Sequence, residues 1–431
     1  MQYYSLQHQA PKVSFKEAVL TGQAPDKGLY FPQTLPKLPK EFIENLPSLT
    51  KEEIGYTVMQ PYVGDDIPQQ DLKRIVSETV NFDFPLVKIN DQISSLELFH
   101  GPTYAFKDVG ARFMSRCLGY FHQSEAKKTT ILVATSGDTG GAVANGFLGV
   151  EGVEVIILYP RGKVSPIQEL QLTTCGQNIT ALEIDGSFDD CQAIVKQAFM
   201  DQDLKQIYNL TSANSINVGR WLPQQLYYFY GLQQWQADQP PVICVPSGNF
   251  GNICAGILAH ISGLPVKHFI AACNINDTVP VFLQTGKYEP KPSTATISNA
   301  MDVGNPSNFG RILEIFGGAA EKLKNHFSSV SVTDAATKIT IKDVYNKTGY
   351  LLDPHGAVAY RALEDYQQSQ PADNGFILET AHPVKFPDVI ESLLNLQIPL
   401  PAGAVQLNPA DKHSIPLSAD YKAVKSWLLT R

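Results

Sequence analysis

Residues 129–149, TTILVATSGDTGGAVANGFLG, contain the pattern that decides the fold of this chain. A short apolar run is followed at once by a glycine-rich turn and then by a segment with helical spacing. The same pattern returns in residues 240–263, PPVICVPSGNFGNICAGILAHISG. Continuous apolar strands that alternate with helices indicate parallel sheets that are covered on both faces. The sequence therefore predicts an α/β protein.

Three further apolar runs extend this pattern: VEVIILY (153–159), KHFIAACNI (267–275) and GFILETAHPVKF (375–386). Two separate units of strand, glycine turn and helix predict two parallel-sheet α/β domains with a cleft between them. Residues 1–90 differ, because they have an amphipathic helical pattern that the proline-rich stretch KGLYFPQTLPKLPKEF interrupts. We predict the following organisation: a mostly helical N-terminal extension (1–90), a large cofactor domain (91–110 and 221–431) and a small α/β domain (111–220).

Composition narrows the possible partners. The chain has 431 residues, too many for one compact core, and its 43% hydrophobic and 18% charged residues are typical of a folded protein. A net charge of −8, with no run of Lys or Arg, argues against nucleic acid or an anionic membrane as the main partner. The longest apolar runs are too short to span a bilayer, and the first residues lack the apolar core of a signal peptide.

The cysteines suggest a compartment. Six cysteines are spread along the chain without a CxxC pair or a short, even spacing. In a chain of this length, such cysteines are typical of reduced and mostly buried thiols. We therefore predict a cytoplasmic protein.

Two glycine-rich loops are candidates for binding an anion. Residues 247–252, SGNFGN, follow a predicted strand and enter a helix, where successive backbone N–H groups can bind phosphate without a cationic side chain. Residues 136–141, SGDTGG, have the same form, and Asp138 and Thr139 add an acceptor and a hydroxyl. The alternative for both loops is a tight turn in which glycine serves only backbone conformation. Neither loop has the lysine of a Walker motif, and no acidic residue follows VEVIILY as a dinucleotide site would require.

Lys107, in the stretch HGPTYAFKD (100–108), stands at what the sequence predicts to be the start of a helix. The simplest interpretation is a solvated lysine whose stem lies over Phe106. The alternative is a lysine that forms a Schiff base, because apolar neighbours and the positive end of a helix both favour the neutral, nucleophilic amine. This stretch by itself favours the first interpretation. No metal site is predicted, since His100, His355 and His382 lack spacing such as HExxH.

Taken together, seven motifs closely resemble those of the threonine synthases. This family consists of pyridoxal-phosphate enzymes of fold type II in the tryptophan-synthase-β superfamily, and the resemblance is to the long form found in many bacteria and in fungi. The motifs lie in the family's order between residues 98 and 387: LFHGPTYAFKD, ATSGDTGGA, YPRGKVSPIQ, NSINVGR, VPSGNFGN, SNAMDVGNPSN and ETAHPVKF.

The resemblance implies a pyridoxal 5′-phosphate site in the cleft. The lysine that binds the cofactor aldehyde falls on Lys107, and the hydroxyl that faces the pyridine nitrogen falls on Thr380. Without the resemblance, Thr380 would be interpreted as a strand-end threonine bonded to backbone. The phosphate cup falls on Gly248, Asn249, Phe250, Gly251 and Asn252. Many relatives have an asparagine beside the phenolic oxygen where this sequence has Asp138, and we expect the loop to hold this carboxylate near the ring.

The resemblance also implies a site for a phosphorylated substrate. Thr139, Asn214, Ser215 and Arg220 fall on the family's positions for the substrate phosphate. Arg161, together with Lys163, is a secondary candidate for the same anion. The implied reaction is the last step of threonine biosynthesis, in which O-phospho-L-homoserine and water give L-threonine and phosphate, with Lys107 moving the protons.

The sequence leaves alternatives open. The same lysine and glycine cup would serve a pyridoxal-phosphate lyase, either a serine/threonine dehydratase or a phosphohomoserine lyase that stops at the keto acid. A non-catalytic module that binds a phosphorylated metabolite is an interpretation of a different class. The N-terminal extension resembles that of monomeric family members, so we expect a monomer.

Overall fold

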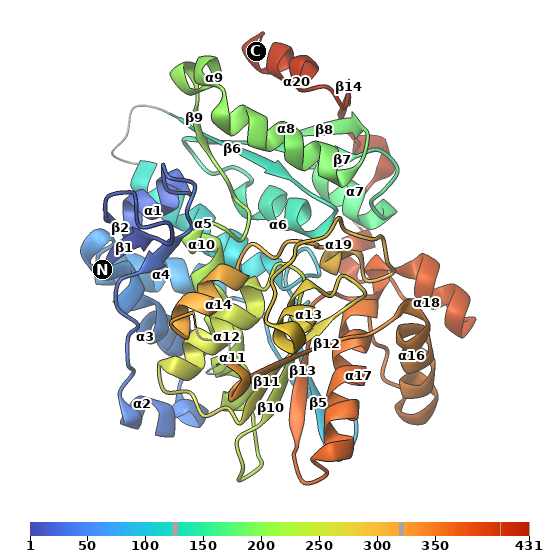
Figure 1. The fold of residues 1–431 in the computed structure, drawn as a ribbon. Coiled ribbons are helices and arrows are strands. Elements are labelled where there is room, and N and C mark those ends of the chain that lie inside the picture. Colours follow the sequence, from blue (N-terminus) through green and yellow to red (C-terminus); the bar gives the residue numbers. More distant parts are fainter. Residues whose placement is uncertain (123–127, 319–322, 406, 431) are drawn as a thin grey trace.

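The computed structural model describes residues 1–122, 128–318, 323–405 and 407–430. Two sheets stand one above the other in the view of Figure 1, and the N-terminal segment packs beside the junction between them. In the part of the chain that the structure describes, no helix is both long enough and apolar enough to cross a membrane. The two parallel sheets with their covering helices confirm the predicted α/β fold class.

The N-terminal segment is mostly helical, as predicted, but it also contains a small antiparallel sheet of order β2-β1-β3. The strands are β1 (Gln2–Ser5), β2 (Val13–Ser14) and β3 (Tyr30–Pro32). The helices are α1 (Phe15–Thr21), α2 (Lys40–Glu44), α3 (Lys51–Val63) and α4 (Gln69–Thr79), with the 3₁₀ turns η1 (Leu46–Ser48) and η2 (Gly64–Asp66). α1 and α3 begin with capping boxes, in which Ser14 and Thr50 each exchange hydrogen bonds with a glutamate three residues later.

The upper sheet has five parallel strands in the order β14-β8-β7-β6-β9. These strands are β6 (Thr129–Ala134), β7 (Val153–Pro160), β8 (Ile179–Asp185), β9 (Asn209–Thr211) and β14 (Ile415–Ser418). The accompanying helices are α5 (Lys107–His122), α6 (Asp138–Phe147), α7 (Pro166–Thr173), α8 (Phe188–Met200), α9 (Gln202–Ile207) and α20 (Tyr421–Leu429). Side chains alternate across β6: Ile131 packs toward α5 and α6, whereas Leu132 packs with α8 and α20.

The lower sheet has six strands in the order β12-β11-β10-β13-β5-β4, all parallel except for β4, which is antiparallel to β5. They are β4 (Leu86–Lys88), β5 (Ile93–Glu97), β10 (Val242–Pro246), β11 (His268–Cys273), β12 (Phe327–Ser331) and β13 (Gly375–Glu379). Around it lie α10 (Val218–Trp221), η3 (Leu222–Gln224), α11 (Gln225–Gln233), α12 (Gly251–Ile261), α13 (Thr278–Thr285), η4 (Asn299–Met301), α14 (Phe309–Ile315), α16 (Asp334–Thr348), α17 (Pro354–Ser369), η5 (Pro383–Lys385), α18 (Pro387–Leu394) and α19 (Ala402–Val405). After η6 (Pro409–Asp411), Lys412 and His413 bond to α7 of the upper sheet.

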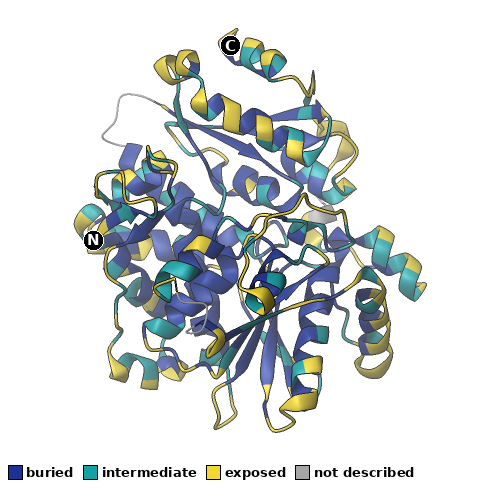
Figure 2. Cartoon of the chain, in the orientation of Figure 1, coloured by how far each residue is buried: buried dark blue, intermediate teal, exposed yellow. Residues whose placement is uncertain are grey.

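Both faces of the central strands are covered, as Figure 2 shows by the continuous dark blue of the strands inside a mixed outer shell. On β10, Ile243 packs with the core that includes α11 and α12, while Cys244 packs with α17. Burial of each such side chain stabilises the fold by about 1.5–3 kcal/mol relative to exposure. The sheet is therefore a rigid support for the loops at its carboxyl edge.

The end of the chain differs from the predicted division into domains. Residues 221–431 are assigned to the large domain by sequence, yet β14 pairs with β8 at the edge of the five-stranded sheet, and α20 packs on α8. Lys425 of α20 reinforces this contact through ion pairs of 2.7 and 2.6 Å with Asp201 and Asp203. The last strand thus returns to the sheet of the small domain.

Candidate active site

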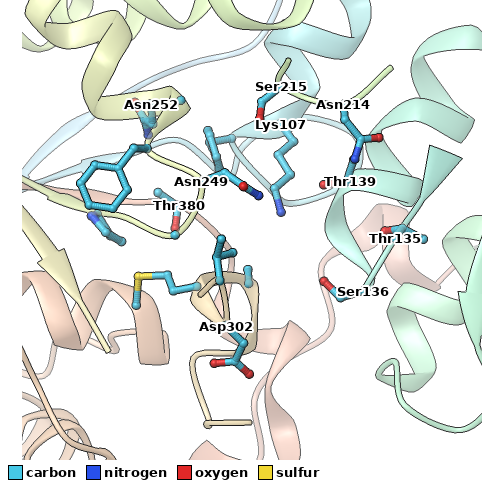
Figure 3. A pocket seen from close by; sticks show the side chains of 18 of the residues that line it. Lys107, Thr135, Ser136, Thr139, Asn214, Ser215, Asn249, Asn252, Asp302 and Thr380 are labelled. Atoms are coloured by element: carbon cyan, nitrogen blue, oxygen red, sulfur yellow. The ribbon is translucent and has the colours of Figure 1, made fainter. Parts of the chain in front are cut away.

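One pocket lies at the carboxyl ends of the strands of both sheets, where loops enter helices. Its lining includes residues that follow β6 of the upper sheet and β10 of the lower sheet, and residues at the starts of α5 and α10. Lys107 projects into the centre, with Asn249 and Thr380 on one side and Thr139 and Asn214 on the other (Figure 3). Ten sequence-predicted site residues besides Lys107 line this pocket, and nine of them are Thr139, Asn214, Ser215, Arg220, Gly248, Asn249, Phe250, Gly251 and Asn252. Thr380 completes the set, so a cleft between the sheets gathers residues that are far apart in sequence.

Lys107 reaches the pocket because the preceding turn is pinned to the segment that follows β13. Phe106 N–H donates to the carbonyl of Thr380 at 2.9 Å, and Ala105 forms an isolated antiparallel bridge with Ala381. Tyr227 Oη donates to the carbonyl of Phe106 from α11. These backbone contacts fix the start of α5 directly beside Thr380.

The turn itself explains the position of Tyr104. Its φ of 58° lies in the left-handed region, a strained conformation for a bulky residue. Tyr104 N–H donates to the carbonyl of Gly101 at 3.1 Å, and its own carbonyl accepts from His382 N–H at 3.0 Å. Asp108 closes the same turn, since its carboxylate accepts from the backbone N–H and the hydroxyl of Thr103 at 2.9 and 2.5 Å. Tyr104 therefore directs the chain into the first turn of α5.

The surroundings of Lys107 favour its neutral amine. Its side chain is 16% exposed, and Nζ lies 5.7 Å from the centre of the Phe106 ring. Burial lowers the pKa of Lys107; Asp138 opposes this effect, and the positive charges of Lys385 and Arg220 add to it. The stem does lie beside Phe106, as the simpler interpretation expects, but the amine points into the pocket rather than into bulk water.

The loop after β10, which the resemblance assigns to the phosphate cup, leads into the start of α12. Phe250 has a φ of 60° and is buried against Phe309, which turns the chain so that the helix begins at Gly251. A Cβ on Gly248 would lie 2.7 Å from Cα of Met301, so only glycine fits this close backbone approach. Nδ2 of Asn252 is buried without a hydrogen-bond partner among the described residues, although its Oδ1 accepts from Tyr228 at 2.9 Å. The cup thus contains an unused donor.

Asp138 begins α6, in the glycine-rich loop after β6, and its contacts define what the carboxylate does. Oδ1 accepts from Lys385 Nζ at 2.7 Å and from Gln168 Nε2 at 2.9 Å, while Oδ2 lies 3.8 Å from Lys107 Nζ. Burial alone would raise the pKa of Asp138, but Lys385 and Lys107 hold it well below the usual range. The carboxylate is therefore ionised and lies behind Lys107.

The segment before α10 carries the third group of predicted residues. Asn217, the second asparagine of the motif NSINVGR, caps α10 and donates to the carbonyl of Val19 at 2.8 Å, so these contacts are structural. Arg220 is 4% exposed and donates from Nη1 to the carbonyl of Ala213, while its Nε is buried without a partner among the described residues. Burial lowers the pKa of Arg220 to about 10, which leaves the guanidinium charged near neutral pH. Arg220 therefore carries a second buried donor without a partner among the described residues.

Arg161 lies apart from the pocket. It is 45% exposed, with Nε 3.3 Å from Glu183 and Nη1 3.9 Å from Asp185, and Lys163 in the same turn is exposed. Both arginine contacts are to acidic side chains of β8, which compete with any anion. Neither cation is among the side chains that line the pocket.

Sequence reasoning missed the residues that support the site from behind. The stretch SNAMDVGNPSN (298–308) forms the wall under Gly248, and Asn308 donates to Ser215 Oγ at 3.1 Å. His355 lines the pocket; its Nδ1 lies 2.6 Å from Asp353, the cap of α17, and its Nε2 accepts from the backbone N–H of Ala300 at 3.2 Å. Both stretches were visible in the sequence, but no local pattern assigns these side chains a role.

Comparison with known proteins agrees with this geometry. Residues 92–378 match the family model described as pyridoxal-phosphate dependent enzyme, residues 2–80 match threonine synthase N terminus, and residues 356–428 match threonine synthase, C-terminal. Threonine synthase from Serratia marcescens is 45% identical over 97% of both chains.

Two solved structures extend the likeness to the fold. The crystal structure of threonine synthase from Escherichia coli has a TM-score of 0.93 at 43% identity and covers the whole of both chains. That of pyridoxal-phosphate-bound threonine synthase from Brucella melitensis has a TM-score of 0.91 at 36% identity over 99% of this chain and 98% of that one. The chain therefore belongs to the threonine synthase family of pyridoxal-phosphate-dependent enzymes.

Proposed function

We propose that this chain converts O-phospho-L-homoserine and water into L-threonine and inorganic phosphate, with Lys107 as its reactive amine. The observation that carries the proposal is one pocket in which a largely buried lysine lies with two separate groups of candidate anion-binding residues, the loop 248–252 and the segment 214–220. One group suits the phosphate of the cofactor, and the other suits the phosphate of the substrate. A pocket for one phosphorylated ligand alone would need only one of them.

The residues present fit pyridoxal 5′-phosphate. Gly248, Asn249, Phe250, Gly251 and Asn252 would hold its phosphate, because Asn252 has an unused buried donor and a side chain at Gly248 would close the approach. Lys107 would hold its aldehyde, and the Thr380 hydroxyl would face its ring nitrogen. When bound, the cofactor supplies an electron sink for the carbanion character that develops next to the amino group.

Lys107 moves the protons of the reaction. A lysine acts as a general base only while its amine is neutral, and burial together with the start of α5 favours that state. From its place at the centre of the pocket, Lys107 takes the proton from the α-carbon of the substrate. It then moves the proton at the β-carbon. The neutral hydroxyl of Thr380, unlike a carboxylate, does not hold a full positive charge on the ring nitrogen.

Arg220, Asn214, Ser215 and Thr139 hold the substrate phosphate, which leaves from the γ-carbon. The guanidinium of Arg220 offers a planar pair of donors, and its Nε has no other use in the described structure. Ser215 is oriented by Asn308, and Thr139 faces the pocket from α6. Thr139 follows β6, and Asn214 and Ser215 follow β9, so the proposed grip comes from the carboxyl edge of the five-stranded sheet together with Arg220 of α10.

The test is to supply O-phospho-L-homoserine to the full-length protein loaded with pyridoxal 5′-phosphate and to quantify phosphate and threonine together. We expect the two products to form in equal amounts. Phosphate accompanied by 2-oxobutanoate instead of threonine would replace the proposal with a lyase. Neither product, with no yellow absorbance of bound cofactor, would favour a non-catalytic binding module.

Replacing Arg220 with methionine is expected to raise the KM for O-phospho-L-homoserine by about 10- to 100-fold, because a charge-assisted hydrogen bond to phosphate contributes roughly 1.5–3 kcal/mol. Steady-state kinetics of the loaded enzyme measure this change. Arg161→Met is the matched control, since Arg161 is half-exposed, pairs with Glu183 and lies outside the pocket. Equal KM values for both variants would remove Arg220 from the substrate site and argue against the proposed phosphate grip.

The proposal includes a cytoplasmic monomer. All six cysteines are unpaired, and five of them are buried, which suits a reducing compartment. Light scattering of the purified protein measures the mass directly, and a dimer would contradict this part of the proposal while leaving the chemistry untouched.

A further inference from the structure

A buried ion pair behind Lys107 has no part in the proposed proton transfers or phosphate binding. Lys385 ends η5, five residues after Thr380, and its side chain is fully buried. Its Nζ lies 2.7 Å from Oδ1 of Asp138, whose side chain is only 4% exposed. The pair joins the segment after β13 of one sheet to the loop after β6 of the other.

Stability alone is a poor reason for this pair. Removing two charges from water costs several kcal/mol per ion, so a buried pair often stabilises a fold no more than apolar side chains of similar volume. Lys385 and Asp138 nevertheless lie within reach of the reactive amine rather than in a remote part of the core. Their position suggests a role in the chemistry of Lys107.

The two oxygens of Asp138 are used differently. Oδ1 is taken by Lys385 and by Gln168, whereas Oδ2 faces Lys107 Nζ at 3.8 Å, beyond hydrogen-bond distance. If Lys385 were absent, Lys107 would be the remaining lysine beside this carboxylate. An ammonium ion on Lys107 would then be strongly stabilised in a site of low dielectric.

We propose that Lys385 is a positioning residue for the reaction, which neutralises the carboxylate of Asp138 and so leaves Lys107 as a free amine for the cofactor aldehyde. The inference rests on the proposed function of Lys107. The charges that act most strongly on Lys107 in the described structure are Asp138 from α6, Lys385 from η5 and Arg220 from α10, and the titratable side chains of Asp302 and His355 line the same pocket. The carboxylate of the neighbouring Asp108 already accepts two hydrogen bonds from Thr103.

The test measures how the rate of cofactor attachment depends on pH. Full-length protein freed of its cofactor is mixed with pyridoxal 5′-phosphate across a pH series, and the rate at which yellow absorbance appears is recorded. Lys385→Met should move the midpoint of this profile up by at least about one pH unit, which is a tenfold slower rate at a fixed pH below the midpoint. Asp138→Asn should move it down, because Lys107 then faces only positive charges. The acid limb of kcat/KM should move in the same directions.

Two further variants separate this role from a structural one. Lys385→Arg keeps the charge and should keep the wild-type midpoint. The double variant Asp138→Asn with Lys385→Met removes both charges at once, so its midpoint should fall between those of the single variants. It should also fold if a single variant does not, since no unpaired buried charge is left. A mere clamp between the sheets predicts unchanged or equal midpoints in the variants, and that result would overturn the proposal.

Failure of the proposed function would give a different result. If Lys107→Ala still gained the yellow absorbance at the wild-type rate, Lys107 would not be the attachment residue, and both proposals would fall. If Lys107→Ala lost the absorbance while Lys385→Met kept the wild-type midpoint, only the role of Lys385 would be overturned.

Discussion

Replacing Lys107 with alanine is expected to abolish covalent attachment of the cofactor and to lower threonine formation by at least about 10³-fold. The size of the effect follows because one side chain supplies both the nucleophile and the base, and general acid–base catalysis alone contributes about 10²- to 10⁴-fold. Two measurements check it: denaturation followed by mass spectrometry of the borohydride-reduced protein, and the initial rate of threonine release. Threonine formation by Lys107→Ala at the wild-type rate would mean that Lys107 is neither the nucleophile nor the base.

The fold should survive this change, so the loss can be assigned to chemistry. Asp138 keeps its ion pair with Lys385 and its bond from Gln168 when Lys107 is removed. The turn before α5 is held by backbone contacts to Thr380, which do not involve the lysine side chain. Lys163→Ala, at an exposed lysine in another loop, is the matched control and should keep both cofactor and activity.

The core of the fold could be predicted because its signals are local. Each apolar run that ends in a glycine turn, such as β6 and β10, carries its own evidence for a buried parallel strand. The short strands β1, β2 and β14 carry no such signal, because two to four residues show no period and pair only through tertiary contacts. The return of β14 to the five-stranded sheet is for the same reason invisible in the sequence.

Some residues of the site could likewise be recognised from local sequence, and others could not. The glycine cup has a physical signature in the sequence, whereas Lys107 by itself resembles a solvated lysine, and only its distant partners change that interpretation. Lys385 and Asn308 have no signature, because their roles arise from contacts across the cleft, with Asp138 and with Ser215.

Arg311 is the most extreme case of a residue whose importance only the structure reveals. It is fully buried, and its guanidinium lies 4.1 Å from the centre of the Trp221 ring. Within the described part of the chain it makes five hydrogen bonds, all to uncharged oxygens, which belong to Tyr30, Ser215, Ile216 and Asn308. Burial lowers the pKa of Arg311 to about 9, and these oxygens together with the ring hold its charge in place. One side chain therefore ties the N-terminal extension to the segment that carries Ser215.

Arg311→Met is expected to lower the free energy of unfolding by about 3–5 kcal/mol, because several buried acceptors lose their partner at once. It should also raise the KM for O-phospho-L-homoserine, since Ser215 is no longer held from behind, while the absorbance of bound cofactor persists. Urea unfolding at equilibrium and steady-state kinetics measure the two effects. Arg74→Met is the control: Arg74 is half-exposed, pairs only with surface carboxylates, and its loss should change stability by less than about 1 kcal/mol. If both variants unfolded at the same urea concentration, the buried arginine would not join the extension to the substrate segment.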